Sequence, residues 1–309
     1  ASNCSSVTGI ELEQYGNTGT SGSHWEARIL LGDYMNGVIY PEEQVISEFT
    51  LALLEDYGIY KANYYTGGLM RYGKNKGCDF LYEKCVDNGE INPFFENEFY
   101  DSIKSPDNMD ASCSSGRQSR TYFAWWIYSS LPSYYRYFTD ETYGGFDPAD
   151  YCPVSREYYK EAKNAYYTGS CSNKGNGGYG TQIFYHREEE TRINDTHIVI
   201  KQIKYNYTSE ELYSITGETY SDHSFCYQST LIKDEFDLND LNVIRAVCYE
   251  SFCSEYSLTI KINEDYFVCP RAGGKIELDG YQGYFLCPDY NLICSGTVLC
   301  NNMFDCVDK

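Results

Sequence analysis

The chain of 309 residues has no long apolar run and comparatively few basic residues. Its longest stretch of apolar character, Phe123 to Leu131, is far shorter than the ~20 residues that a membrane-spanning helix needs. Lys and Arg number 24 against 45 Asp and Glu, so the formal net charge is −21. Such a surface repels polyanions, which argues against nucleic acid and anionic lipid as partners. The acidic residues are spread along the chain, and we interpret them as a source of solubility.

Histidine is also scarce, which limits the metal sites and catalytic sets that these residues can form. The four histidines are His24, His186, His197 and His223, and no two stand four residues apart. The H-E-x-x-H pattern of a zinc-binding helix is therefore absent. We interpret His186, beside three glutamates, as part of a solvated face, His197 as a strand residue and His223 as a loop residue. No Ser-His-Asp or Cys-His set is positively indicated.

A glycine-rich segment, GNGGYG from Gly175 to Gly180, has the G-x-G-x-x-G spacing of dinucleotide-binding proteins. That spacing indicates a nucleotide site only between a strand and a helix. Neither a strand pattern before it nor a helix pattern after it is present, so we interpret the segment as a loop.

Cysteine, in contrast, is abundant. There are fourteen, with ten after Cys113, and their number and density predict disulfide bonds. No C-x-x-C pair occurs, which argues against a zinc ribbon. Three N-x-S/T sequons, at Asn3, Asn194 and Asn206, predict N-linked glycans and the secretory pathway, with a final location outside the cell or on its surface. The candidate disulfide cysteines are Cys4, Cys78, Cys85, Cys113, Cys152, Cys171, Cys226, Cys248, Cys253, Cys269, Cys287, Cys294, Cys300 and Cys306.

The clearest predicted helix runs from Pro41 to Gly58. Proline suits the first helical position, glutamates favour the first turn, and glycine marks the end. A second, short helix is expected from Ser155 to Tyr167. Apolar residues at helical spacing predict one buried face on the first helix, namely Val45, Ile46, Phe49, Ala52 and Leu53, with Leu51 and Leu54 at its margins.

Strand patterns dominate from Thr196 onward, for example in Ser257 to Ile262, where β-branched and aromatic residues alternate with polar ones. The residue composition changes near Gly77, after which cysteines become frequent, and we place a domain boundary there. These patterns together predict an α+β protein with one part at residues 1–76 and a cysteine-rich, β-rich part at residues 77–309.

Several quoted segments show a specific likeness to a known family. Taken alone, His24 and Met35 would be a surface histidine and a core methionine. Their flanks, GSHWEARILLGDYMNGV, resemble the leishmanolysin family of metzincin zinc metallopeptidases, in which a Ser-His-Trp histidine precedes a methionine turn. LMRYGKNKGCDFLYEKC is also similar to this family, and the closing CPDYNLICSGTVLCNNMFDC resembles its ciliate-type members.

The resemblance implies roles for two residues. His24 would be the third zinc ligand, and Met35 the methionine that lies beneath the metal. Residues 1–76 would be the C-terminal part of a metzincin catalytic lobe, with a methionine turn and a long helix, followed by a disulfide-rich, mainly β domain. Because the family needs two histidines and a glutamate from an H-E-x-x-H helix, no catalytic residue is expected in this chain, which alone should bind zinc weakly and be inactive.

Three explanations for the missing helix remain open: an upstream fragment that was cleaved but stays attached, a true deletion, or a segment outside these residues. The first functional hypothesis is the C-terminal portion of a secreted or cell-surface zinc metalloendopeptidase that acts on proteins or peptides. The alternative is a non-catalytic surface or assembly glycoprotein that retains the fold. Since Cys4 is the only cysteine before Cys78, we also predict a disulfide between them.

Overall fold

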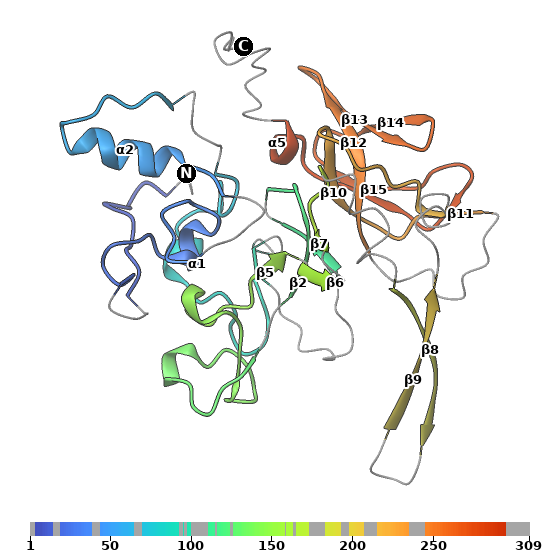
Figure 1. The fold of residues 1–309 in the computed structure, drawn as a ribbon, viewed down its shortest axis with the longest axis horizontal. Helices are drawn as coiled ribbons and strands as arrows, with labels where there is room; N and C mark the ends of the chain where they lie inside the picture. Colours follow the sequence, from blue (N-terminus) through green and yellow to red (C-terminus); the bar gives the residue numbers. More distant parts are fainter. Residues whose placement is uncertain are drawn as a thin grey trace.

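Figure 1 shows the fold of the chain in a computed structural model. The structure describes residues 4–14, 19–38, 44–64, 70–92, 95, 98–99, 111–114, 116–123, 126–157, 159–162, 165–172, 183–192, 198–206, 215–234 and 245–294. Several sequence predictions fall outside these ranges: the loop at Gly175, His197, the sequons at Asn3 and Asn194, and the cysteines Cys300 and Cys306.

The helices of the described part are short. They are α1 (Ala27–Leu30), α2 (Glu48–Asp56), α3 (Asp79–Tyr82) and α5 (Tyr290–Ile293), with 3-10 turns η3 (Ser133–Tyr135) and η4 (Asp147–Ala149). None combines the length and the apolar character that a bilayer crossing requires. Buried residues between Trp25 and Val154 form one hydrophobic core, which we call the first core. An aromatic cluster of Tyr72, Phe80, Phe95 and Phe99 packs α3 into it.

Helix α2 begins later than the sequence pattern predicts. Its first residue is Glu48, and the Ser47 side chain caps it by accepting from the backbone N–H groups of Phe49 and Thr50. The residues at 41–43 lie outside the described ranges, and Val45 forms a bridge to Asp33 before the helix. The predicted start was therefore wrong, because a tertiary contact holds this segment extended.

The predicted buried face of α2 is confirmed only in part. Val45, Phe49 and Leu53 pack against the first core, whereas Ile46 and Leu54 are exposed. The fully buried residue of the helix is Thr50, a polar side chain that the pattern did not select. Its hydroxyl forms hydrogen bonds with the buried side chains of Trp25 and Asp33.

Strands form most of the remaining structure. The largest sheet has six strands in the order β14-β13-β12-β10-β17-β15, all pairs antiparallel, and a three-stranded sheet has the order β1-β2-β5. Figure 1 shows the six-stranded sheet in orange and red, apart from the blue N-terminal helices. The six strands are β10 (Ser224–Ser229), β12 (Arg245–Cys253), β13 (Leu258–Ile262), β14 (Asp265–Cys269), β15 (Gly274–Ile276) and β17 (Phe285–Cys287).

The smaller sheets occupy the middle of the chain. The three-stranded sheet consists of β1 (Ala111–Cys113), β2 (Arg120–Phe123) and β5 (Ser155–Glu157). The two-stranded pairs are β3 (Trp126–Ile127) with β4 (Tyr143–Gly144), β6 (Tyr159–Ala162) with β7 (Ala165–Thr168), β8 (Ile183–Arg192) with β9 (Ile198–Asn206), and β11 (Ile232–Lys233) with β16 (Tyr281–Gln282). The predicted strands after residue 196 are thus confirmed.

The helix predicted from Ser155 to Tyr167 was wrong. This segment forms β5, β6 and β7 instead. Strand β5 pairs with β2, about thirty residues upstream, and β6 and β7 form a hairpin. The pairing partner decides the structure here, and tertiary context of this kind overrides local helix propensity.

Six disulfides join the described cysteines. The predicted pair Cys4–Cys78 is present, and Cys85–Cys152 lies in the first core. Cys113–Cys226 and Cys171–Cys248 join segments of the middle of the chain to β10 and β12, while Cys253–Cys294 and Cys269–Cys287 close the six-stranded sheet region. Cys226 and Cys248 face each other across β10 and β12, yet each bonds to a different distant cysteine. The sheet is therefore tied twice to the preceding chain.

Candidate functional site

The candidate site begins at His24, which lies in a loop just before α1. The Nδ1 atom of its ring is 3.2 Å from the carbonyl oxygen of Thr20 and 2.9 Å from the hydroxyl oxygen of Ser23. Because a carbonyl oxygen can only accept, we assign the ring proton to Nδ1, which leaves the lone pair on Nε2. A histidine fixed in this tautomer by its second nitrogen is in the form that ligates metals.

The residue after His24 is tied directly to the turn that contains Met35. The backbone N–H of Trp25 donates to the carbonyl oxygen of Met35 at 2.9 Å. The side chain of Asn36 completes the connection, since its Nδ2 donates to the carbonyl of Trp25 and its Oδ1 accepts from the backbone N–H of Gly32. The segments of His24 and Met35, eleven residues apart in sequence, are therefore neighbours in space, joined by a backbone hydrogen bond.

A buried carboxylate holds the Met35 turn against α2. Asp33 accepts hydrogen bonds from the backbone N–H of Met35 at 2.6 Å and of Ser47 at 3.2 Å, and from the Thr50 hydroxyl at 2.9 Å. The same hydroxyl accepts a bond from the indole Nε1 of Trp25 at 2.8 Å. Thr50 is therefore buried because it links the indole to the carboxylate.

The far side of the turn approaches the histidine loop. A Cβ atom added at Gly37 would lie 2.9 Å from side-chain carbons of Thr20, the residue whose carbonyl accepts from His24. Only glycine fits this approach without a shift. The Met35 side chain is partly buried and packs against the first core.

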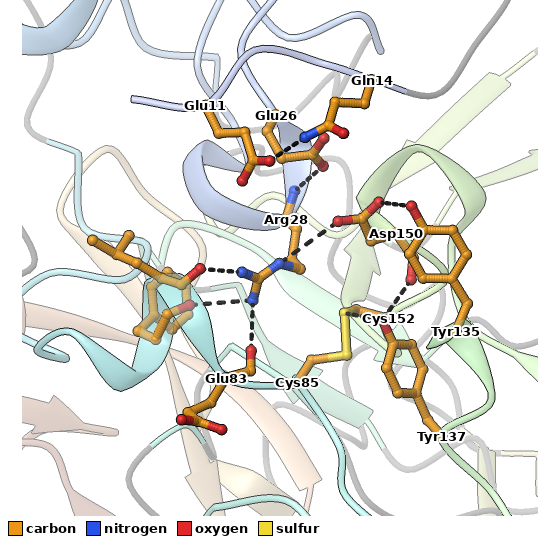
Figure 2. Close-up of polar contacts among 12 residues, drawn as sticks. Glu11, Gln14, Glu26, Arg28, Glu83, Cys85, Tyr135, Tyr137, Asp150 and Cys152 are labelled. Atoms are coloured by element: carbon orange, nitrogen blue, oxygen red, sulfur yellow. Dashed lines mark hydrogen bonds and ion pairs between the residues drawn. A yellow bond between two sulfur atoms is a disulfide. The ribbon is translucent and has the colours of Figure 1, made fainter. Parts of the chain in front are cut away.

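Two charged residues of the α1 region are buried next to the histidine loop. Glu26 caps α1 by accepting from the N–H of Arg28, and its burial, reinforced by the negative charge of Asp150, raises its pKa to about 8. The guanidinium of Arg28 donates to the carbonyl oxygens of Phe80, Leu81 and Glu83 and lies 3.7 Å from Asp150 (Figure 2). Arg28 thus satisfies the last carbonyls of α3.

A second layer of contacts holds Asp150. The hydroxyl of Tyr135 donates to its carboxylate at 2.7 Å, and the hydroxyl of Tyr137 donates to its carbonyl oxygen at 2.9 Å (Figure 2). The neighbouring disulfide Cys85–Cys152 joins the two sides of this layer. The segment after His24 is therefore linked, through Arg28 and Asp150, to residues far later in the chain.

No sequence motif pointed to Asp33, Thr50 or Arg28. One signal for Asp33 was available, because an aspartate two residues before a turn residue commonly accepts from its backbone N–H. The other two depend on partners 17 and 52 residues away, as in Thr50 with Asp33 and Arg28 with Phe80. No local pattern reveals such pairs.

The zinc implied by the family resemblance can be tested against these donors. His24 presents a suitable nitrogen, but among the described residues no group of three or more His, Cys, Asp or Glu side chains could hold a metal ion. The other histidine with a described side chain, His223, lies against Phe252 on the C-terminal sheet. The described residues thus include His24 as a candidate ligand and do not by themselves form a complete zinc centre.

Comparison with known proteins finds similarity along nearly the whole chain. A family model for leishmanolysin matches residues 1–300. The leishmanolysin-like peptidase of Caenorhabditis briggsae is 26% identical over 94% of this chain, and the leishmanolysin of Leishmania major is 25% identical over 96% of it. A leishmanolysin homolog of Crithidia fasciculata is 37% identical over 48% of this chain.

This chain spans only part of those relatives, namely 43% of the C. briggsae protein, 42% of the L. major protein and 22% of the C. fasciculata protein. The family match nevertheless covers nearly all of the 309 residues. It agrees with the mixed helix and sheet structure and the six described disulfides. The chain belongs to the leishmanolysin family, a family of zinc metallopeptidases.

Proposed function

We propose that this chain is the C-terminal portion of a zinc metalloendopeptidase and that His24 supplies one of three protein ligands to the metal. The observation that carries the proposal is the contact of the His24 Nδ1 atom with the Thr20 carbonyl and the Ser23 hydroxyl, from which we assign the ring proton to Nδ1 and the free lone pair to Nε2. Two histidines and a glutamate would come from an H-E-x-x-H segment upstream of these residues. Zinc, when bound, supplies Lewis acidity for peptide-bond hydrolysis.

The chain's own residues would act by positioning. The bond between Trp25 and Met35 sets the turn beside the histidine loop, and Asp33 holds that turn against α2. Met35 would then serve as the methionine of a metzincin turn. Gly37 and the residues up to Tyr40 would form part of the wall beside a peptide substrate.

Other features of the whole protein belong to the same proposal. It would be secreted or carried on the cell surface, with glycans at Asn3, Asn194 and Asn206, and residues 1–76 and 77–309 would be separate domains. Buried residues from both sides of this boundary, for example Trp25, Phe80 and Val154, share one core. Such a core ties the two parts of this chain to each other. An upstream fragment, if the protein is cleaved, would be a further partner.

A second candidate is a non-catalytic surface or assembly glycoprotein that retains the family fold. The observation in its favour is that no group of three or more His, Cys, Asp or Glu side chains that could hold a metal occurs among the described residues. It predicts a protein without zinc, whose partners are other surface proteins.

Native mass spectrometry of the natural protein, with metal counted in the same spectrum, separates the two candidates. The peptidase proposal expects an upstream segment, attached or covalently continuous, and about one zinc per complex. Replacing His24→Gln should abolish the bound zinc, whereas the matched variant His223→Gln should retain it. A glycosylated chain that carries no zinc and no upstream segment would overturn the peptidase proposal and support the second candidate.

A further inference from the structure

The outermost described strand of the six-stranded sheet has an open edge. β14 pairs with β13 on one side only, and Figure 1 shows this hairpin, in orange, on the outside of the C-terminal sheet. Edge strands are commonly protected by proline, lysine or a bulge. β14 has the sequence DYFVC and pairs with β13 in an unbroken register, so it carries none of the three.

The backbone groups at this edge follow from the geometry of the hairpin. A two-residue turn, Asn263 and Glu264, connects β13 and β14, with Asn263 at φ 54°. In such a hairpin the closing pair is hydrogen-bonded and later pairs alternate. The N–H and C=O groups of Tyr266 and Val268 therefore point away from β13. No described residue bonds to these groups.

The same two residues also present their side chains to solvent. Tyr266 is 61% exposed and Val268 is 63% exposed. Phe267 between them packs against the second hydrophobic core, which is formed by buried residues between Tyr227 and Cys294. On the outer face, Phe252 lies in the row of Val268, and its ring centroid is 6.2 Å from that of Tyr266. The open edge is thus bordered by an apolar surface, which we call the β14 face and define as Phe252, Tyr266 and Val268.

Acidic groups stand at the turn end of the β14 face. The side chain of Glu264 is 95% exposed, and its carboxylate lies 3.8 Å from Lys261. Asp265 begins β14 and is exposed. Because the whole chain carries a net charge of −21, a cationic partner is favoured and a second copy of this chain is repelled.

We propose that β14 binds an extended peptide segment, which adds a strand to the sheet. The segment would run antiparallel to β14, with apolar side chains opposite Tyr266 and Val268 and a basic residue beside Glu264 and Asp265. Backbone hydrogen bonds supply affinity in this mode of recognition, and the alternate side chains supply specificity. The proposal does not depend on zinc or on His24.

A labelled synthetic peptide tests this pairing on the complete 309-residue chain, produced with its disulfides. The probe is fluorescein-labelled Thr-Val-Thr-Val-Thr-Lys-amide, whose two valines would lie opposite Val268 and Tyr266. Its control is the same peptide with both valine nitrogens methylated, which keeps the side chains and removes the two N–H donors. Fluorescence polarisation should show saturable binding of the probe, and binding about tenfold or more weaker for the control.

A variant of the chain tests the same point from the protein side. Val268→Pro removes one edge donor without breaking the bonds to β13, since proline is tolerated at an open edge. It should weaken peptide binding about tenfold, whereas Val268→Thr, which retains the backbone donor, should change it less. Disulfide mapping and circular dichroism check that both variants fold, and the methylated peptide keeps the test valid if Val268→Pro does not.

Three outcomes would overturn the proposal. One is the absence of probe binding at millimolar peptide. Another is equal binding of the methylated and unmethylated peptides, since recognition would then not use strand pairing. The third is a concentration-dependent dimer of the chain, lost in Val268→Pro, without peptide binding, because the occupant of the edge would then be a second copy.

Discussion

Thr50 and Asp33 form a buried hydrogen bond of 2.9 Å that joins helix α2 to the turn containing Met35. The Thr50 hydroxyl donates to the carboxylate and also accepts from the indole of Trp25. The residue after His24 and the turn containing Met35 are therefore attached to the same helix. This hydroxyl therefore adds to the Trp25–Met35 backbone bond in holding two segments that the proposed function requires to be fixed.

Replacing Thr50→Val should lower the free energy of unfolding by about 1–3 kcal/mol, because the indole N–H of Trp25 loses its described acceptor in the interior. Thr50→Ser, which retains the hydroxyl and loses one methyl group, should cost about 1 kcal/mol or less. Urea unfolding measures both. Hydrogen exchange at the Trp25 indole, followed by NMR, should accelerate in the valine variant alone; equal exchange in both variants would contradict the role given to this hydroxyl.

Arg28 should be irreplaceable by lysine. Its guanidinium donates hydrogen bonds to the carbonyl oxygens of Phe80, Leu81 and Glu83. The single ammonium group of a lysine cannot place N–H donors at all three positions. We expect Arg28→Lys to lower the free energy of unfolding by about 2–4 kcal/mol, since buried carbonyls lose their partners. Thermal unfolding measures the loss.

The matched control for Arg28 is Arg136→Lys, at an arginine that pairs with the largely exposed Glu141 and donates to one carbonyl oxygen, that of Leu131, instead of three. An exposed ion pair contributes about 0–1 kcal/mol, so this variant should remain close to the parent chain. Similar losses at both arginines would show that the three carbonyl bonds of Arg28 are not the cause.

The sequence predicted the features that depend on local pattern. The strands after residue 196 and the pairing of Cys4 with Cys78 were found as expected. Cysteine spacing restricts the possible pairs, and alternation marks strands that have one face in a core. Both signals can be read from the sequence, although the disulfide joins residues 74 apart, because cysteine is scarce before Cys78.

The predictions that failed depend on contacts distant in sequence. The start of α2 is set by Asp33, which accepts from the N–H of Ser47, so the preceding segment pairs with the turn instead of coiling. Ser155 begins a strand because β2 is available to pair with it. At the site, the sequence identified His24 and Met35 by resemblance, but Asp33 and Thr50 could be found only in the fold.

Loss of the disulfide Cys4–Cys78 should weaken the attachment of the N-terminal segment to α3. The bridge closes a separation of 74 residues, and such a loop typically contributes about 2–4 kcal/mol to the free energy of unfolding. The double variant Cys4→Ser with Cys78→Ser should show this loss in guanidinium unfolding under non-reducing conditions. Peptide mapping of the parent chain provides the direct check, and a Cys4 linked to any other cysteine would contradict the assigned pair.

Glu98 should make the stability of the fold depend on pH. Burial raises the pKa of its carboxyl group from 4.5 to about 7, although Lys76 lies 3.3 Å away and opposes the shift. Between these two values the folded chain retains a proton that the unfolded chain has released. The free energy of unfolding should therefore fall as the pH rises from about 4.5 to 7, by about 3 kcal/mol, and level off above.

Other buried carboxyl groups, such as Glu26 and Glu218, also have raised pKa values, so the dependence of the parent chain alone does not isolate Glu98. The difference between the parent and Glu98→Gln, measured by urea unfolding across this pH range, does isolate it. The glutamine cannot ionise, and its variant should gain stability over the parent as the pH rises. The exposed Glu264→Gln variant should show no such gain; a pH-independent difference between the parent and Glu98→Gln would show that folding does not raise the pKa of Glu98.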